Sequence, residues 1–415
     1  MKKLLSILII WISTAVYASG QENVKFIQDL DFLYLHLKEC VSYQTQRRSQ
    51  KLLYHKYIEI RKTAELRNLS VLNQYILLYD LMDVVNDQNN TIQLNEGMFS
   101  YANLTLKDTP NSVSTQDKFF SFPILHLSAD SLMRELRSKP LQSVEGIYPY
   151  NDSIEIGVFL YEPNKYLGII LNSKDPSWHS LEPVFYIVHK DSNSYRIVGK
   201  NFNNKGIYSN LSKIYNGVIK SLNLHKKNSI CTISTPEFHQ NFIFTTLNNH
   251  MSYLKLGSFN YSTSELKIIQ SFQILFEDSL YTPNLIVDVR NNDGGYNQIS
   301  KSFYKYLKKY SGNLFILMNY HTAHEAERFI LKLNYRKNVT LLGDTTRGAF
   351  SYAQSNPSLQ TSPSGVFKIA LTNYKKGWRK YLYYENVGIA PSISLSNCEN
   401  WIKQTQDIID NYVRK

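Results

Sequence analysis

The stretch at residues 285–295, LIVDVRNNDGG, decides the fold of the last third of the chain. Its first five residues are apolar except for Asp288, and they run into a turn of asparagine and glycine. A short apolar run that ends in such a turn predicts a strand buried in a sheet. Gly294 and Gly295 have no Cβ atom, so the backbone at this turn is able to approach another group closely.

Apolar runs and helical patterns alternate on both sides of this stretch. Strands are expected at residues 252–256, 314–318 and 339–343, and helices at residues 264–277, 299–309 and 323–334. Strand–helix–strand order predicts a buried, mostly parallel sheet with helices packed on it. We therefore expect an α/β core in this part of the chain.

The first part of the chain follows a helical pattern. In residues 24–86 apolar side chains recur every three or four positions, as in a series that begins after Ser70: Leu72, Tyr75, Tyr79 and Met82. This spacing predicts helices with one buried face, and Ser70 is a suitable N-cap. Residues 87–115 are polar and predict a loop-rich connection.

The middle of the chain has short apolar runs separated by turn residues, from residue 143 to about residue 246. The pattern predicts a mainly antiparallel β module, either a small barrel or a sandwich, with one helix around residues 210–222. The predicted fold class is therefore a multidomain α+β and α/β protein. Its predicted parts are a signal peptide (1–20), a helical N-terminal domain (21–115), a β-rich middle module (116–248) and an α/β core (249–415).

The signal peptide is predicted from charge followed by a short apolar run. Lys2 and Lys3 precede apolar residues 4–16, and small residues follow at positions 18–20. This order is typical of a secretory signal peptide, and the run is too short for a stable membrane span. We expect a secreted or periplasmic protein.

Composition excludes several classes of function. The formal net charge is +12, but the positive residues are dispersed, and no nucleic-acid motif accompanies them. We therefore expect no nucleic-acid partner. The three cysteines, Cys40, Cys231 and Cys398, are too far apart for a disulfide scaffold or a CxxC metal module, and their disulfide state stays open. No cofactor and no metal are predicted.

Five segments occur in an order that resembles a known family. They are YLKLGSF (253–259), the stretch at 285–295, TAHEAERF (322–329), LGDTTRGA (342–349) and GIAP (388–391). The series resembles the tail-specific, or C-terminal processing, serine peptidase family. The resemblance implies a core similar to crotonases and Clp-type proteases, a serine-type peptidase (hydrolase) ancestry, and binding of extended peptides or protein C-termini.

The chain departs from the family pattern at both catalytic positions. The matching register places His324 where the family has its nucleophilic serine. Ala349 stands where the lysine-dependent members have their lysine, after Arg347 and Gly348. Thr322 is the nearby aliphatic hydroxyl, and a histidine is not the acyl-forming nucleophile of a serine–lysine mechanism. A pseudoenzyme is therefore the preferred interpretation.

The resemblance also assigns site residues. His324 and Glu327 occupy the catalytic segment, and Glu327 is expected to tether the helix through hydrogen bonds. The expected binding residues are Gly294, Gly295, Thr322, Arg347 and Gly348. Two plainer interpretations stay open, in which the glycines only form a turn and His324 only begins a helix. A zinc site at His321, His324 and Glu327 is disfavoured, because positions i to i+6 swing around a helix.

Three hypotheses for function follow. The preferred one is an exported member of this family that binds extended peptides or protein C-termini and has lost catalysis. The first alternative is an active serine-type endopeptidase with a nucleophile that the pattern does not reveal. The second alternative is a carrier of lipid or another small hydrophobic ligand, by analogy with non-proteolytic relatives.

Overall fold

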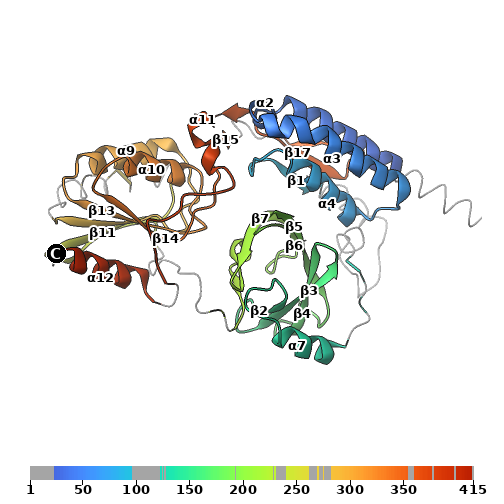
Figure 1. Cartoon of the computed structure of the whole chain (residues 1–415), viewed down its shortest axis with the longest axis horizontal. Coiled ribbons are helices and arrows are strands. Elements are labelled where there is room, and N and C mark those ends of the chain that lie inside the picture. Colours follow the sequence, from blue (N-terminus) through green and yellow to red (C-terminus); the bar gives the residue numbers. More distant parts are fainter. Residues whose placement is uncertain are drawn as a thin grey trace, which may run out of the picture. The chain divides into compact units, whose positions relative to one another are not determined.

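The structure is a computed structural model with a mixed α/β fold (Figure 1). It describes residues 23–95, 122–123, 125, 128–191, 193–227, 229, 240–260, 269–270, 274, 282–353, 359–375, 378–396 and 399–413. The described residues form two compact units. The first draws on Met1–His126, Val198–Ser209 and Tyr352–Lys376, and the second on Leu127–Ile197, Asn210–Ser351 and Gly377–Lys415.

The first unit begins with helices, as predicted. A helix at residues 23–39 is followed by α2 (Val41–Thr45), α3 (Arg47–Leu66) and α4 (Val71–Met82). The Ser70 side chain accepts a hydrogen bond from the Asn73 backbone N–H, which confirms it as the N-cap of α4. The predicted apolar faces are buried, because the side chains that form them are at most 3% exposed: Phe26, Leu30, Leu33, Leu37, Leu72, Tyr75, Tyr79 and Met82.

A three-stranded sheet joins distant parts of the chain within the first unit. Strand β1 (Thr91–Leu94) pairs antiparallel with β17 (Phe367–Ala370), which also pairs with β16 (Gln360–Thr361). The prediction of a loop-rich connection at residues 87–115 is therefore wrong at β1. The four-residue strand is stabilised by a partner more than 270 positions away in the chain, which local sequence does not reveal. A second pair joins β15 (Tyr352–Ala353) and β18 (Tyr374–Lys375).

A buried acid in the first unit predicts an unusual pH dependence. Asp87 is 6% exposed, and its carboxylate accepts hydrogen bonds from Thr372 Oγ1 at 2.5 Å and from the Asn89 N–H at 3.0 Å. Burial raises the pKa of the Asp87 carboxyl above its usual value, more than these bonds lower it. A raised pKa stabilises the fold below the unfolded-state pKa, and this contribution is lost as pH rises through the folded-state pKa.

We therefore expect Asp87→Asn to raise the Tm by a few degrees at pH 8 and to leave it nearly unchanged at pH 4. Thermal unfolding followed by circular dichroism at both pH values measures this difference. Asp152→Asn, at an exposed carboxyl, is the control and should change neither Tm. An Asp87→Asn protein that is less stable than wild type at pH 8 would contradict the expectation.

The middle of the chain forms an eight-stranded sheet in the order β2 to β9, as a meander. Its strands are β2 (Gly146–Pro149), β3 (Ile154–Glu162), β4 (Lys165–Ser173), β5 (Pro183–Asp191), β6 (Ser194–Lys200), β7 (Ile207–Tyr215), β8 (Val218–Ile219) and β9 (Leu224–His225). Helix α7 (Ala129–Arg137) packs against β2 and β3 (Figure 1). The helix predicted around residues 210–222 is wrong, because this segment continues β7 and contains only the single 3-10 turn η1 (Lys220–Leu222).

The second unit also contains the predicted sheet of the core, with six strands. The order is β10 (Phe242–Asn248), β11 (Met251–Leu256), β12 (Asn284–Asp288), β13 (Asn313–Met318), β14 (Val339–Gly343) and β19 (Ile393–Ser394). Neighbours from β11 to β19 are parallel, and β10 is an antiparallel edge. The sequence interpretation placed residues 242–248 in the middle module, but they join this sheet. A two-residue turn between β10 and β11 makes their hairpin the locally favoured pairing.

Helices cover both faces of this sheet (Figure 1). Helices α9 (Asn297–Lys309) and α10 (Glu325–Asn334) share an apolar core with one face, through residues such as Phe303, Phe329 and Val287. Helix α12 (Trp401–Val413) covers the other face, where Trp401 packs with Ile286. The alternation of Ile286 and Val287 between the two cores explains why consecutive residues of the strand, 285–287, are all apolar. The short turns α11 (Trp378–Tyr381) and η2 (Leu382–Tyr384) precede β19.

Several predictions fall on residues that the structure does not describe. The signal peptide at 1–20, and Cys231 and Cys398, lie outside the described residues. The helix predicted at 264–277 is described only at residues 269, 270 and 274, which are helical. Within the described part of the chain, no helix has both the length and the apolar character that a membrane crossing requires.

Candidate functional site

The predicted site residues gather where three parallel strands end. The turn at residues 289–296 follows β12, the turn at residues 319–324 follows β13, and residues 344–349 follow β14. The carboxyl ends of neighbouring parallel strands lie at one edge of a sheet, which is where α/β proteins commonly place their ligands. The structure therefore brings together three of the segments that were singled out in the sequence.

His324 is held in a strained backbone conformation at the start of α10. It is the N-cap residue, with φ 54° and ψ −116°, a region that non-glycine residues rarely adopt and that costs about 1–3 kcal/mol. The neighbouring peptides are fixed by hydrogen bonds from the Ala323 N–H to the Asn292 carbonyl and from the Arg328 N–H to the His324 carbonyl. A strained turn between strand and helix is the type of geometry that presents the nucleophile in α/β-hydrolases. Here the residue at that turn is a half-buried histidine.

Gly294 contacts this turn directly, and Gly295 does not. A Cβ atom on Gly294 would lie 2.8 Å from the His324 Cβ and 2.8 Å from the Glu325 nitrogen, so only glycine fits. The Gly294 N–H donates to Asn292 Oδ1 at 2.9 Å, and this bond occupies the donor that the sequence interpretation assigned to ligand binding. Gly295 instead forms a parallel bridge with Phe259.

Glu327 connects α10 to the turn after β14. Its carboxylate is fully buried and accepts four hydrogen bonds, from the His324 N–H (3.0 Å), Thr346 Oγ1 (2.6 Å), the Gly348 N–H (2.6 Å) and the Ala349 N–H (2.9 Å). Burial raises the pKa of Glu327, and the four hydrogen bonds act in the opposite direction. This geometry is a structural tether between the two turns.

Thr322 lies in the protein interior, where its hydroxyl and its carbonyl are hydrogen-bonded to the protein. Its side chain is fully buried, and its hydroxyl donates to the Val289 carbonyl at 2.8 Å while it accepts from the Asn319 N–H. The Thr322 carbonyl accepts a hydrogen bond from the Arg347 N–H at 3.1 Å. In this arrangement the threonine joins the ends of β12, β13 and β14, and its hydroxyl is not presented to a substrate.

Gly348 is required by close packing as well as by the tether. It has φ +87°, and a Cβ atom there would lie 2.7 Å from the Gly388 nitrogen and 2.8 Å from the Tyr384 carbonyl. The GIAP segment (388–391) therefore packs against the turn after β14. Arg347, which directly precedes Gly348, is half-buried.

The middle module contributes side chains that the sequence did not reveal. The Lys220 ammonium, 4% exposed, lies 2.5 Å from Asp344 Oδ2, and the Tyr215 hydroxyl donates to Asp344 Oδ1 at 3.3 Å. Asp344 is the first residue after β14, so β7 and η1 attach directly to the end of that strand. No spacing or motif links residues 215 and 220 to residue 344, and only the tertiary fold brings them together.

Two further contacts join β7 to the same edge of the core sheet. Lys213 Nζ donates to the Val387 carbonyl at 2.6 Å, and the Tyr320 hydroxyl donates to the Leu211 carbonyl at 3.2 Å. Burial lowers the pKa of Lys213, although Asp344 favours its charged form. The module thus places a half-buried lysine beside the turns that carry the predicted site.

His321, in the turn after β13, lies in a buried environment with two cations near it. Burial, together with Arg347 and Lys220, lowers the pKa of His321 to about 4, so this imidazole is neutral at physiological pH. Burial is the larger cause of this shift, and the two cations add to it. Among the residues that the structure describes, no group of three or more His, Cys, Asp or Glu side chains is placed to hold a metal ion.

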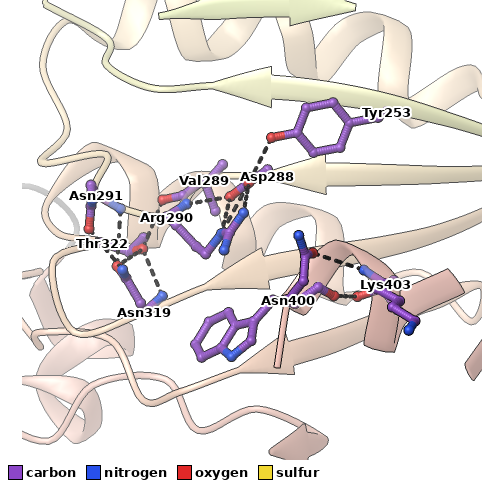
Figure 2. A network of polar contacts seen from close by, with 11 residues as sticks. Tyr253, Asp288, Val289, Arg290, Asn291, Asn319, Thr322, Asn400 and Lys403 are labelled. Carbon is purple, nitrogen blue, oxygen red and sulfur yellow. Dashed lines mark hydrogen bonds and ion pairs between the residues drawn. The ribbon is translucent and has the colours of Figure 1, made fainter. Parts of the chain in front are cut away.

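A buried ion pair supports the strand that leads to the site (Figure 2). Arg290 bonds Asp288 through Nε at 2.9 Å and through NH2 at 2.6 Å, and the Tyr253 hydroxyl donates to the same carboxylate at 2.8 Å. The guanidinium lies 5.5 Å from the centre of the Trp401 ring. The Asn291 N–H donates a hydrogen bond to Asn319 Oδ1, and Asn319 Nδ2 donates one to Asn291 Oδ1. These two bonds join the turns after β12 and β13.

Comparisons with known proteins give similarity of fold only. No protein-family model matches the chain, and no curated protein matches it. Similar solved structures include a lipoprotein from Streptococcus agalactiae (17% identity, 42% of this chain and 70% of that chain, TM-score 0.30). They also include a photosystem II D1 C-terminal processing protease, with 13% identity over 90% of this chain and 94% of that chain and a TM-score of 0.38. Mature CPAF has 12% identity over 93% of this chain and 96% of that chain and a TM-score of 0.47. At these identities and TM-scores the likeness carries no conclusion about activity.

Proposed function

We propose that this chain is an exported binding protein on a tail-specific-peptidase-like scaffold. In this proposal it takes up extended peptides or protein C-termini beside His324, Gly294 and Arg347, and it does not hydrolyse them through a serine–lysine pair. The core is proposed to be of the crotonase and Clp-protease type. Main-chain hydrogen bonding of the strand-addition kind suits an extended peptide.

The observation that carries the proposal is the identity of the residue at the strained turn, which is His324. A strand-to-helix turn with φ 54° and ψ −116° is retained, yet its side chain is the imidazole of His324. The neighbouring hydroxyl, on Thr322, is buried and bonded to the Val289 carbonyl. The Glu327 carboxylate is committed to four structural hydrogen bonds. These features support a preorganised site without an acyl-forming nucleophile.

The charge around the turn supports an anionic ligand group. Arg347 and Lys220 act on His321, and together with burial, which is the larger cause, they disfavour a proton on that imidazole. A carboxylate of a bound peptide would be stabilised by the same cations. This supports peptides that end in, or carry, a carboxylate near the site.

The test is retention and cleavage of a peptide library by purified protein, followed by mass spectrometry. We expect wild type to retain intact peptides, and His324→Ala to lose about tenfold or more of the retention, equivalent to about 1.4 kcal/mol. His179→Ala, at an exposed position of the middle module, is the matched control and should retain peptides as wild type does. A fluorophosphonate probe should label none of the three proteins.

Other outcomes would favour the alternative functions. Cleavage that disappears in His324→Ala would make His324 catalytic and overturn the proposal. Cleavage that persists in this variant, or labelling by the probe, would indicate an active endopeptidase with a different nucleophile. Absence of both retention and cleavage, with lipid co-purifying in the mass spectrum, would favour the carrier.

Export is part of the same proposal. The charged and apolar N-terminal sequence supports it. Expression of the full chain in a bacterial host should give a secreted or periplasmic product whose N-terminus, by sequencing, begins near residue 19 or 21. A cytoplasmic product that keeps Met1 would contradict export.

A further inference from the structure

A cavity in the β-rich module is unrelated to the site at His324. Its volume is about 320 Å³, within the range of small-molecule sites, and it is lined by the end of α7, by β2 and β3, and by the residues after β9. All of these elements belong to the second unit. Nothing in the proposed peptide-binding function uses this cavity.

One wall of the cavity is apolar. Leu136, Leu141 and Ile147 contribute aliphatic side chains to it, from the last turn of α7, from the following turn and from β2. Leu136 is 2% exposed and therefore belongs to the packed interior of the module. Aliphatic side chains of this kind offer a surface to an alkyl chain, and burial of that chain is favourable by about 0.8 kcal/mol per methylene.

The other wall has more positive than negative charge. Arg137, Lys139, Lys226 and Lys227 line the cavity, together with a single carboxylate, that of Glu155. Lys227 pairs with Glu155 at 2.6 Å. Lys139 pairs outside the lining, with Glu135 at 3.1 Å and Glu145 at 3.0 Å. The two remaining cations, Arg137 and Lys226, form no ion pair among the described residues.

Lys226 is the more informative of these two cations because it is buried. Its residue is 6% exposed, and Nζ donates to the Pro140 carbonyl at 2.8 Å and to the Ser143 carbonyl at 2.7 Å. An ammonium has three donors, and these carbonyls use two of them. Burial of this cation is costly and lowers the pKa of Lys226 to about 8, although the Glu145 carboxylate, which pairs with Lys139, favours its charged form. An anion in the cavity would offset this cost.

Arg137 lies at the exposed side of the cavity. Its guanidinium contacts Met133 Sδ at 3.2 Å, which is a weak acceptor. A guanidinium presents a planar fork of donors that matches a carboxylate in a bidentate arrangement. The buried ammonium and the exposed guanidinium are therefore two cationic donors in the lining of a cavity that also has aliphatic side chains.

We propose that this cavity binds a small amphiphile, an aliphatic carboxylate of medium chain length. Its carboxylate is held by Lys226 and Arg137, and its alkyl chain packs on Leu136, Leu141 and Ile147. Charge complementarity selects the anionic head, and the apolar wall selects the tail. The site is independent of peptide binding at His324, so either proposal stands if the other fails.

Isothermal titration calorimetry with decanoate on the full mature chain tests the proposal. We expect saturable binding of decanoate at one site, and no binding of decanol, which has the same chain without the charge. Lys226→Met should weaken decanoate binding about tenfold or more, and Arg137→Ala several-fold. Lys174→Ala, at an exposed lysine of the same module, should bind as wild type does.

Each outcome decides for or against the site. Circular dichroism shows whether Lys226→Met folds, and Arg137→Glu, at an exposed position, tests the charge requirement without this risk. Weakening of decanoate binding by Arg137→Glu with unchanged Tm supports the proposal. Absence of decanoate binding overturns it. Equal binding of decanol, or decanoate binding unaffected by both charge variants, also overturns it, because the head group would then not be recognised.

Discussion

Replacement of Arg290 by methionine is expected to destabilise the second unit by about 3–5 kcal/mol, the usual cost of removing one partner of a buried ion pair. Arg290 is 2% exposed and Asp288 is fully buried, and the two side chains bond at 2.6–3.0 Å (Figure 2). Without the guanidinium, the Asp288 carboxylate keeps only the Tyr253 hydroxyl and the Arg290 N–H as donors. The charge left inside the protein is the main cause of the loss.

Urea denaturation followed by circular dichroism measures this change. The double variant Asp288→Asn, Arg290→Met should recover a large part of the lost stability, because neither partner of the pair then leaves its own charge uncompensated. Arg134→Met, at an exposed arginine of α7, is the control and should stay within about 0.5 kcal/mol of wild type. If Arg290→Met is as stable as this control, the ion pair does not support β12.

The second large effect is expected from Glu327→Ala. The substitution leaves four donors without their acceptor, namely the hydroxyl of Thr346 and the N–H groups of His324, Gly348 and Ala349. Each buried unsatisfied donor costs about 1–3 kcal/mol. Even if water reaches some of them, we expect a loss above about 3 kcal/mol, and separation of the turns after β13 and β14.

Glu327→Gln serves as the graded comparison for Glu327→Ala. It retains the shape and one acceptor oxygen, but its NH2 group would face the donors that the second oxygen now accepts. We expect an intermediate loss in urea denaturation. Glu399→Ala, at an exposed carboxyl, should have no measurable effect. A Glu327→Ala protein with wild-type stability would show that the carboxylate does not hold these turns together.

The regular elements were predictable because their patterns are local. The 3.6-residue periodicity of the N-terminal helices, the N-cap at Ser70 and the apolar strand at residues 285–289 each depend on a few neighbouring residues. The elements that sequence reasoning missed depend on distant partners. Strand β1 is stabilised by β17, and residues 210–215 form a strand because β7 pairs in the meander.

The candidate site was predictable to a similar degree. The motifs located the turns that meet near His324, and the structure brings Gly294, Thr322, Glu327, Arg347 and Gly348 there. The side chains from the middle module were not predictable. Lys213 contacts Val387 and Lys220 contacts Asp344, and each lysine lies more than 120 residues before its partner. No residue pattern marks these pairings.

The pairing of β1 with β17 also has a consequence for the order in which the chain folds during synthesis. The helices at residues 23–82 emerge from the ribosome well before residues 367–370, the strand that pairs with β1 and lies more than 270 residues after it. Contacts this remote in the chain close slowly, and the buried Ile92 stays exposed until they form. A fragment that ends at residue 126 should therefore be unstable or aggregate, although it contains every helix that the structure describes in this unit.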